Sequence, residues 1–100
     1  MNMPKEILSI AIFEPLAGRE ESFLGAVRGL MAALAKGGYC RDLLYRDLNS
    51  QNQYVLLRYW KSEESRRAAL EDFEVLGCWS KIAEEIQTSK VYETLSEVEP

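Results

Sequence analysis

The sequence predicts an α+β fold of the ferredoxin-like kind, in a single domain that spans residues 1–100. Three observations predict it. Two segments carry apolar residues at helical spacing, strand-like segments flank both of them, and residues 54–65 run from a strand directly into a helix start. The expected order is β-α-β-β-α-β, with an antiparallel sheet and the helices on one face.

Residues 7–13 (ILSIAIF) form a short, apolar and β-branched run between Pro4 and Pro15, which predicts a strand buried on both faces. Gly18 breaks the run, and residues 19–36 then predict a helix that ends at the Gly37–Gly38 pair. Its apolar face recurs at helical spacing and comprises Phe23, Val27, Leu30, Met31 and Leu34.

The same helix carries a second stripe of small residues, Gly25, Gly29 and Ala33. A glycine inside a helix costs about 1 kcal/mol relative to alanine, so something should compensate. We expect close approach of this helix to the sheet; the alternative is that the stripe leaves room for a ligand.

Residues 39–48 and 53–60 predict a β-hairpin around the turn-forming residues 49–52. Both faces of the first strand mix apolar and charged side chains, as expected near a sheet edge. Both faces of the second strand are largely apolar, so both should be covered.

The strand that ends at Trp60 leads into a helix start, where Ser62 can cap the helix and two glutamates follow it. A short helix should run to about Glu71, and Asp72 should cap another helix. That second helix is expected to bury Val75, Trp79, Ile82 and Ile86, and residues 90–96 alternate as a final strand.

Two helices cover only one face of such a sheet, so the apolar residues of the other face need a partner. A second copy of the chain, packed sheet to sheet about a two-fold axis, is the simplest cover. We therefore expect a homodimer through the sheet face.

Composition excludes several classes of function. The net charge is −4 and no basic run occurs, which argues against a nucleic-acid partner. No apolar run is long enough to cross a membrane, and residues 1–6 lack a signal-peptide pattern, so a cytoplasmic location is expected. The chain has no histidine, which argues against a metal or haem site, and Cys40 and Cys78 are expected to be buried, reduced thiols.

The residues Trp60-Lys-Ser-Glu-Glu, followed by Ala68-Ala-Leu and by 73–79 (FEVLGCW), resemble the pattern of antibiotic biosynthesis monooxygenase (ABM) domains. The resemblance extends over residues 7–98. It implies a dimeric α/β-barrel with a pocket in each subunit between sheet and helices. Relatives include cofactor-free monooxygenases of aromatic polyketides, quinol-oxidising enzymes and haem-degrading enzymes.

The resemblance places the functional positions of the haem degraders at Ala11, Ala69 and Trp79, counted along the motif without gaps. None of the three holds the residue that haem degradation uses, which argues against that activity. The functional positions of the polyketide oxygenases fall at Leu56, Trp60 and Arg66. Only the tryptophan is retained, so Trp60 is the candidate catalytic residue.

Candidate substrate-binding residues surround Trp60 in the sequence or share its aromatic chemistry. The alternative for the aromatic residues is core packing, which we favour for Trp79 and leave open for Trp60. For Arg58, if it points into the sheet face, we expect an anionic partner across the dimer, in preference to a substrate phenolate. The candidates are Arg58, Tyr59, Phe73, Trp79 and Tyr92.

The resemblance implies a cofactor-independent monooxygenase that acts on a quinol-like or polycyclic aromatic substrate. The alternative is a non-catalytic dimeric domain of the same fold that binds a small ligand or serves in assembly. Without histidine, a proton acceptor would be a carboxylate such as Asp42 or Glu93, a tyrosine or a lysine, although we expect these groups to be solvated. A closed cavity between the first helix and the sheet would favour the enzyme.

Overall fold

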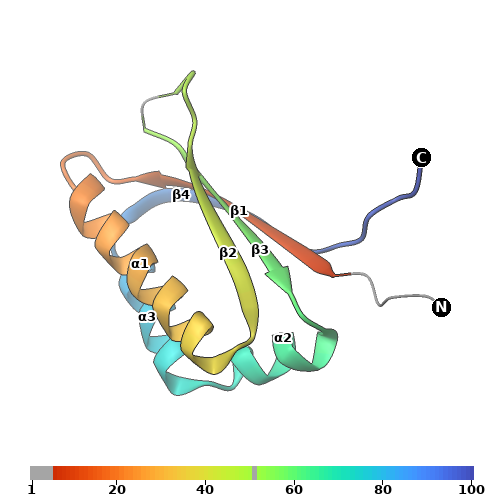
Figure 1. Ribbon diagram of the computed structural model, residues 1–100. Helices are drawn as coiled ribbons and strands as arrows, with labels where there is room; N and C mark the ends of the chain where they lie inside the picture. The colour runs from red at the N-terminus through yellow and green to blue at the C-terminus, as the bar shows by residue number, and fades with distance from the viewer. Residues whose placement is uncertain (1–5, 51) are drawn as a thin grey trace.

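The computed structural model describes residues 6–50 and 52–100. Four strands form one antiparallel sheet in the order β2-β3-β1-β4, and the helices lie on one face of it (Figure 1). The predicted ferredoxin-like fold is confirmed, with the second helical segment divided in two. The elements are β1 (Ile7–Pro15), α1 (Glu20–Gly37), β2 (Cys40–Arg46), β3 (Tyr54–Trp60), α2 (Glu63–Leu70), α3 (Phe73–Ala83) and β4 (Ile86–Leu95).

The helix ends follow the expected capping residues. Gly38 ends α1 in the left-handed conformation with φ 69°, where a side chain would be strained. The Ser62 hydroxyl accepts a 3.0 Å bond from the Ser65 N–H at the start of α2. The Asp72 carboxylate accepts bonds from the first N–H groups of α3 and also from the Tyr39 hydroxyl. These contacts confirm the predicted caps and separate α2 from α3.

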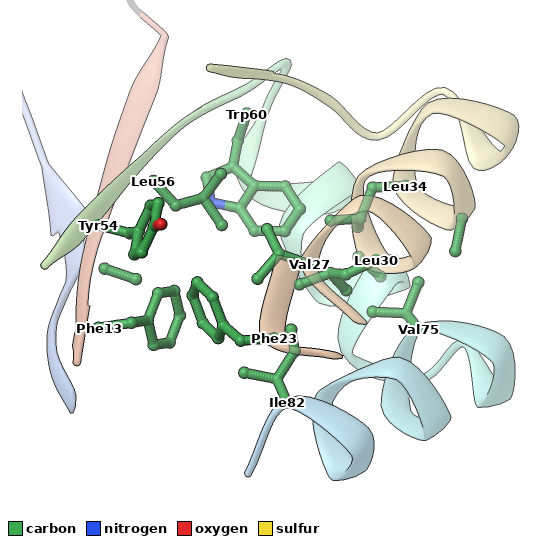
Figure 2. Close-up of a cluster of buried hydrophobic side chains, with 13 residues drawn as sticks. Phe13, Phe23, Val27, Leu30, Leu34, Tyr54, Leu56, Trp60, Val75 and Ile82 are labelled. Carbon is green, nitrogen blue, oxygen red and sulfur yellow. The ribbon is translucent and has the colours of Figure 1, made fainter. Parts of the chain in front are cut away.

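The core lies between the sheet and the two longer helices (Figure 2). Aromatic rings join the layers: Phe13 of β1 meets Phe23 of α1 edge to face, with ring centroids 5.5 Å apart. The expected apolar face of α1 is buried apart from the partly exposed Met31. The other buried residues of the core are Ala11, Ala33, Tyr54, Leu56, Trp60, Ala69, Val75 and Ile82.

Several local expectations were wrong. Gly25 and Gly29 are exposed, and a Cβ added to either would meet no atom within 4 Å, so no close approach to the sheet explains them. Ile86 is the first residue of β4 rather than part of the preceding helix, because the chain turns at Glu84. The first strand is buried on its helix side only. Pro4 and Gln51, which figured in the expected strand boundary and turn, lie outside the described residues.

The sheet face away from the helices carries a continuous set of apolar and aromatic side chains, here called the open sheet face. Because paired residues share a face, the register places Ile10, Leu57 and Leu43 in one row across it. Tyr45 is 51% exposed and Leu43 39% exposed. Within the described part of the chain, no helix has both the length and the apolar character that a bilayer span requires.

Candidate functional site

A cavity of about 260 Å³ lies between the helix side of the sheet and helices α2 and α3. No described residue of α1 lines it, so the expected position beside the first helix was wrong. The buried side chains of α1 belong to the core cluster, whereas the short side chains of Ser9, Ala11 and Ala69 line the space under α2. The lining residues are Ser9, Ala11, Leu56, Arg58, Trp60, Arg66, Ala69, Leu70, Val75, Trp79, Val91 and Glu93.

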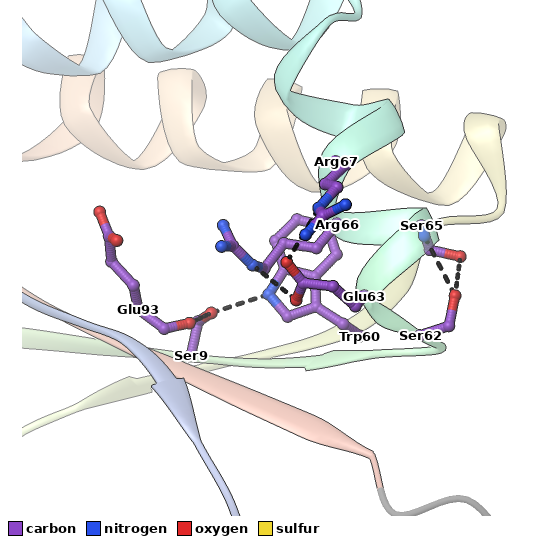
Figure 3. A network of polar contacts seen from close by, with 8 residues as sticks. All are labelled: Ser9, Trp60, Ser62, Glu63, Ser65, Arg66, Arg67 and Glu93. Atoms are coloured by element: carbon purple, nitrogen blue, oxygen red, sulfur yellow. Dashed lines mark hydrogen bonds and ion pairs between the residues drawn. The ribbon is translucent and has the colours of Figure 1, made fainter.

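Two tryptophans supply the aromatic wall of the cavity, and they are the only tryptophans in the sequence. Trp60 is 5% exposed, and its indole N–H donates a 2.7 Å hydrogen bond to the Ser9 hydroxyl oxygen (Figure 3). Trp79 of α3 is partly buried and packs against the core, as its helical spacing predicted, with its ring centroid 6.2 Å from that of Phe13, and it also lines the cavity. Both indoles therefore present surface to a ligand.

Arg58 is the buried cation of the site. Its Nε and Nη2 atoms donate bonds of 2.8 and 2.9 Å to the two carboxylate oxygens of Asp42, and both side chains are 5% exposed. The two residues are direct partners in the β2–β3 register. The expected ion pair across a dimer was therefore wrong, and so was the expectation that Asp42 is solvated. Each charge of the pair compensates the other, because burying either one without a partner would cost several kcal/mol.

The guanidinium of Arg58 also lies near both indoles. Its central carbon is 5.5 Å from the centroid of the Trp60 ring and 5.7 Å from that of Trp79. A cation at these distances is attracted by the negative face of an indole, and Arg and Trp form the strongest such pairs. The site thus holds a fixed positive charge within an aromatic wall.

Four polar residues cross the helix side of the sheet, one on each strand, and we call them the polar row. Asp42 pairs with Arg58, Arg58 pairs with Ser9 in the β1–β3 register, and the Ser9 hydroxyl donates to the main-chain oxygen of Glu93. The rest of this face is largely apolar. Burying polar side chains within an apolar layer costs folding free energy, which points to a functional role for the polar row.

Two further charged side chains, Arg66 and Glu93, line the cavity. Arg66 of α2 is held by Glu63, with a distance of 3.2 Å between Nε and Oε2. Figure 3 shows the Arg66 guanidinium and the Glu93 carboxylate on the helix side of the sheet, with Arg66 over the Trp60–Ser9 contact and Glu93 beyond Ser9. Glu93 is exposed, so it can exchange a proton with solvent while its side chain lines the cavity.

The Cys40 thiol lies beside the Arg58–Asp42 pair, with 3.6 Å between its sulfur and an Asp42 oxygen. Burial, together with the negative charge of Asp42, raises the pKa of Cys40 to about 12. The thiol is therefore uncharged at neutral pH and unreactive. Cys78 is also a free, half-buried thiol.

No family model matches the sequence, and no curated protein matches it. Solved structures do. PA3566 of Pseudomonas aeruginosa superposes with a TM-score of 0.81 at 16% identity, covering 99% of this chain and 100% of that one. A variant of SnoaB, a cofactor-independent oxygenase of Streptomyces nogalater, gives 0.79 at 22% identity, covering 89% and 90%. An antibiotic biosynthesis monooxygenase gives 0.80 at 15% identity, covering 93% and 99%.

The chain has the fold of the antibiotic biosynthesis monooxygenases. Within this ABM fold, the cavity has a simple relation to the positions that the sequence motif singled out. All six positions inferred by counting along the motif line it, on four different elements. They are Ala11, Leu56, Trp60, Arg66, Ala69 and Trp79. Motif counting therefore located the cavity, even though most of these positions hold unreactive side chains.

The ABM fold brings only some of the predicted substrate-binding residues together. Arg58 and Trp79 line the cavity beside Trp60, the candidate catalytic residue. Tyr59 and Tyr92 lie on the open sheet face, because neighbouring residues of a strand point to opposite faces. Phe73, the first residue of α3, is 90% exposed. The expectation that these three rings stack beside Trp60 is therefore not met in the chain itself.

Sequence reasoning missed Ser9 entirely. The available signal was its isolation as the one polar residue within the apolar segment 7–13. It also treated Asp42 and Arg58 separately, although a hairpin with the turn at 49–52 places them opposite each other.

Proposed function

We propose that this protein is a cofactor-independent monooxygenase that acts on a small quinol-like or polycyclic aromatic substrate. The observation that carries the proposal is the polar row, which supplies the Glu93 carboxylate and the buried Arg58 cation to one aromatic cavity, from strands β4 and β3 with β1 between them. The ABM fold supports it, because SnoaB, a cofactor-independent oxygenase, shares that fold. The cavity is slightly below the usual range for ligand sites, about 300–1,000 Å³, which favours a substrate of few rings.

The chemistry requires a substrate that can supply all the electrons. A phenolic ring system with an acidic CH₂ group loses a proton and gives a delocalised anion, which transfers one electron to O₂. Recombination of the resulting radical with superoxide forms a carbon–oxygen bond, and protonation gives a hydroperoxide. Loss of water then breaks the O–O bond, so that CH₂ and O₂ become C=O and H₂O. The protein contributes a proton acceptor and a dry, oriented cavity.

The residues of the cavity suit these roles. Trp60 and Trp79 bind the ring system through their indole faces. Glu93 is the proton acceptor, since both oxygens of Asp42 already accept bonds from Arg58. Trp60 is held in place by its bond to Ser9, so its ring has a fixed orientation toward the substrate.

Oxygen consumption with 1,8-dihydroxyanthrone tests the proposal. The wild-type protein should consume O₂ above the spontaneous rate and transfer one atom of ¹⁸O₂ to the product carbonyl. Glu93→Gln should lower the enzymatic rate at least about 100-fold, as expected for loss of a general base. Trp60→Phe should also lower it, whereas Glu71→Gln, a matched change on an exposed glutamate, should not. Equal rates for the wild type and both cavity variants would refute the proposal.

The alternative is a non-catalytic domain of the same fold that binds a small aromatic ligand. The cavity with its two indoles supports this function equally well, and the lack of a histidine base favours it. Binding of the anthrone without O₂ consumption or ¹⁸O incorporation would favour the alternative.

The second part of the proposal is a homodimer through the open sheet face. The exposed side chains of Leu43, Tyr45 and Tyr92 support it, because a soluble monomer rarely leaves a contiguous apolar face of this kind uncovered. Sedimentation at micromolar concentration should give twice the chain mass, and Leu57→Lys, in the middle of the face, should give a monomer. The exposed Leu48→Lys, beyond the end of β2, is the matched control. A wild-type monomer would refute the dimer.

A further inference from the structure

Arg58 is a buried cation whose hydrogen-bonding capacity is not exhausted by the protein. A guanidinium has five N–H donors, and Asp42 accepts one from Nε and one from Nη2. Among the described residues, no oxygen accepts a hydrogen bond from Nη1. Every fully buried side-chain nitrogen or oxygen in this part of the chain has a hydrogen-bond partner. The Cys40 sulfur is the one further hydrogen-bond neighbour recorded for Arg58 among the described residues, and the side chain of Arg58 lines the cavity, where Nη1 can meet a ligand.

The groups around Arg58 do not offer Nη1 an anion. The Cys40 thiol beside the pair is protonated at neutral pH, because burial raises its pKa to about 12. Both oxygens of Asp42 already accept bonds from Arg58, and the carboxylate of Glu63 pairs with Arg66 and Arg67. A cation that is 4% exposed and lines an aromatic cavity is suited to an anionic atom of a ligand.

The polar row sets the spacing between the two ends of such a ligand. Arg58 and Glu93 lie on β3 and β4, with β1 between them. Neighbouring strands are about 4.8 Å apart, so the two residues start from strands about 10 Å apart. This spacing fits two or three fused rings with an oxygen at one end and an acidic C–H at the other.

We infer that Arg58 is the specificity-determining residue of the cavity and binds the ionised oxygen of a phenolic ring, with Asp42 as the residue that positions it. The inference rests on the proposed function for its link to O₂ chemistry, since the phenolate is the electron-rich form of such a substrate. Trp60 and Trp79 hold the ring beside the guanidinium, where a neutral ether of the same shape leaves Nη1 without a charged acceptor.

The probes are 4-nitro-1-naphthol, an acidic and coloured phenol, and its methyl ether, which cannot ionise. Because both tryptophans of the chain line the cavity, quenching of intrinsic fluorescence reports binding there. At pH 8 the wild type should bind the naphtholate at least about tenfold more tightly than the ether, as expected for a hydrogen bond to a charged group. An absorbance titration should show a lower pKa for the bound naphthol than for the free one.

The double variant Arg58→Met/Asp42→Leu removes both charges together, which avoids leaving one buried charge without a partner. It should bind both probes with similar affinity, and the pKa of the bound naphthol should rise above the free value because of desolvation. Asp42→Asn keeps the cation but weakens its anchor, and should reduce the preference only in part. Arg28→Met removes an exposed arginine of α1 and should change nothing.

Equal affinity of the wild type for the two probes would overturn the inference, and that measurement does not depend on any variant folding. A preference that persists in the double variant would overturn it as well. Failure of the proposed function is distinguishable: a naphtholate preference that depends on Arg58, without O₂ consumption, supports the inference and refutes the oxygenase. Oxygen consumption without any preference for the naphtholate over its ether supports the oxygenase and refutes the inference.

Discussion

The indole Nε1 of Trp60 and the hydroxyl oxygen of Ser9 lie 2.7 Å apart, and this bond ties the last residue of β3 to the neighbouring strand β1. The same hydroxyl donates to the main-chain oxygen of Glu93 on β4. One small side chain therefore connects three strands on the helix side of the sheet and orients one of the two indoles of the cavity.

Ser9→Ala should destabilise the protein by about 1–3 kcal/mol, because the buried indole N–H loses its acceptor. Urea unfolding followed by circular dichroism measures the change. In the Trp60→Phe background the same substitution should cost much less, since no indole N–H is left unsatisfied. Equal losses in the two backgrounds would show that the bond does not couple these residues.

Asp42→Ala should lower the free energy of unfolding by about 3–5 kcal/mol, because it leaves the Arg58 cation buried without an anion. Arg58→Met/Asp42→Leu should be close to the wild type in stability, since apolar side chains of similar size replace the pair. Urea unfolding of both variants checks the order. A double variant less stable than Asp42→Ala would contradict the prediction.

The Arg19–Glu85 ion pair makes the stability of the protein depend on pH. The two hydrogen bonds from Arg19, 2.6 and 2.7 Å long, hold the pKa of Glu85 below its ordinary value of 4.5, and burial opposes this effect. A lowered pKa means that the folded state favours the carboxylate, so the gain is present above pH 4.5 and is lost as pH falls through the folded-state pKa.

Glu85→Gln should therefore lower the melting temperature at pH 7, and the difference from the wild type should shrink below pH 4.5. Thermal unfolding between pH 7 and pH 3 measures this difference. The exposed Glu71→Gln serves as the control and should show a much smaller dependence. A Glu85→Gln deficit that stays constant down to pH 3 would rule out the ion pair as its cause.

Gly25→Ala and Gly29→Ala should each stabilise the protein by about 0.5–1 kcal/mol, because both glycines are exposed in the middle of α1 and an added methyl group meets nothing. Gly38→Ala should have the opposite sign, since Gly38 adopts φ 69° at the helix end. Thermal unfolding of the three variants tests the contrast. Destabilisation by either helical substitution would mean that the glycines have a role that their surroundings do not reveal.

Much of the fold could be predicted because local signals agree with one another. The caps at Ser62 and Asp72, the helix end at Gly38 and the apolar face of α1 all lie where side-chain chemistry and spacing placed them. The glycines at 25 and 29 show the limit of this reasoning. Spacing places them on one stripe, but only the packing of the whole helix decides whether that stripe faces the sheet or solvent.

The site was less predictable because it depends on pairing between strands. Arg58 and Asp42 are 16 positions apart, and only the hairpin register makes them partners. Tyr59 was placed beside Trp60 because the two are adjacent in the sequence, although a strand sends adjacent side chains to opposite faces. The aromatic residues at 73 and 92 were grouped by chemical type, which carries no information on distance.

The polar row draws one residue from each of the four strands, so its integrity depends on their alignment. A shift of one position in any strand would move that strand's contribution to the opposite face of the sheet. Insertions or deletions within the strands would thus dismantle the site while leaving much of the composition intact. Divergence of ligand preference in such a scaffold should proceed by exchanging side chains at fixed positions, with strand lengths held constant.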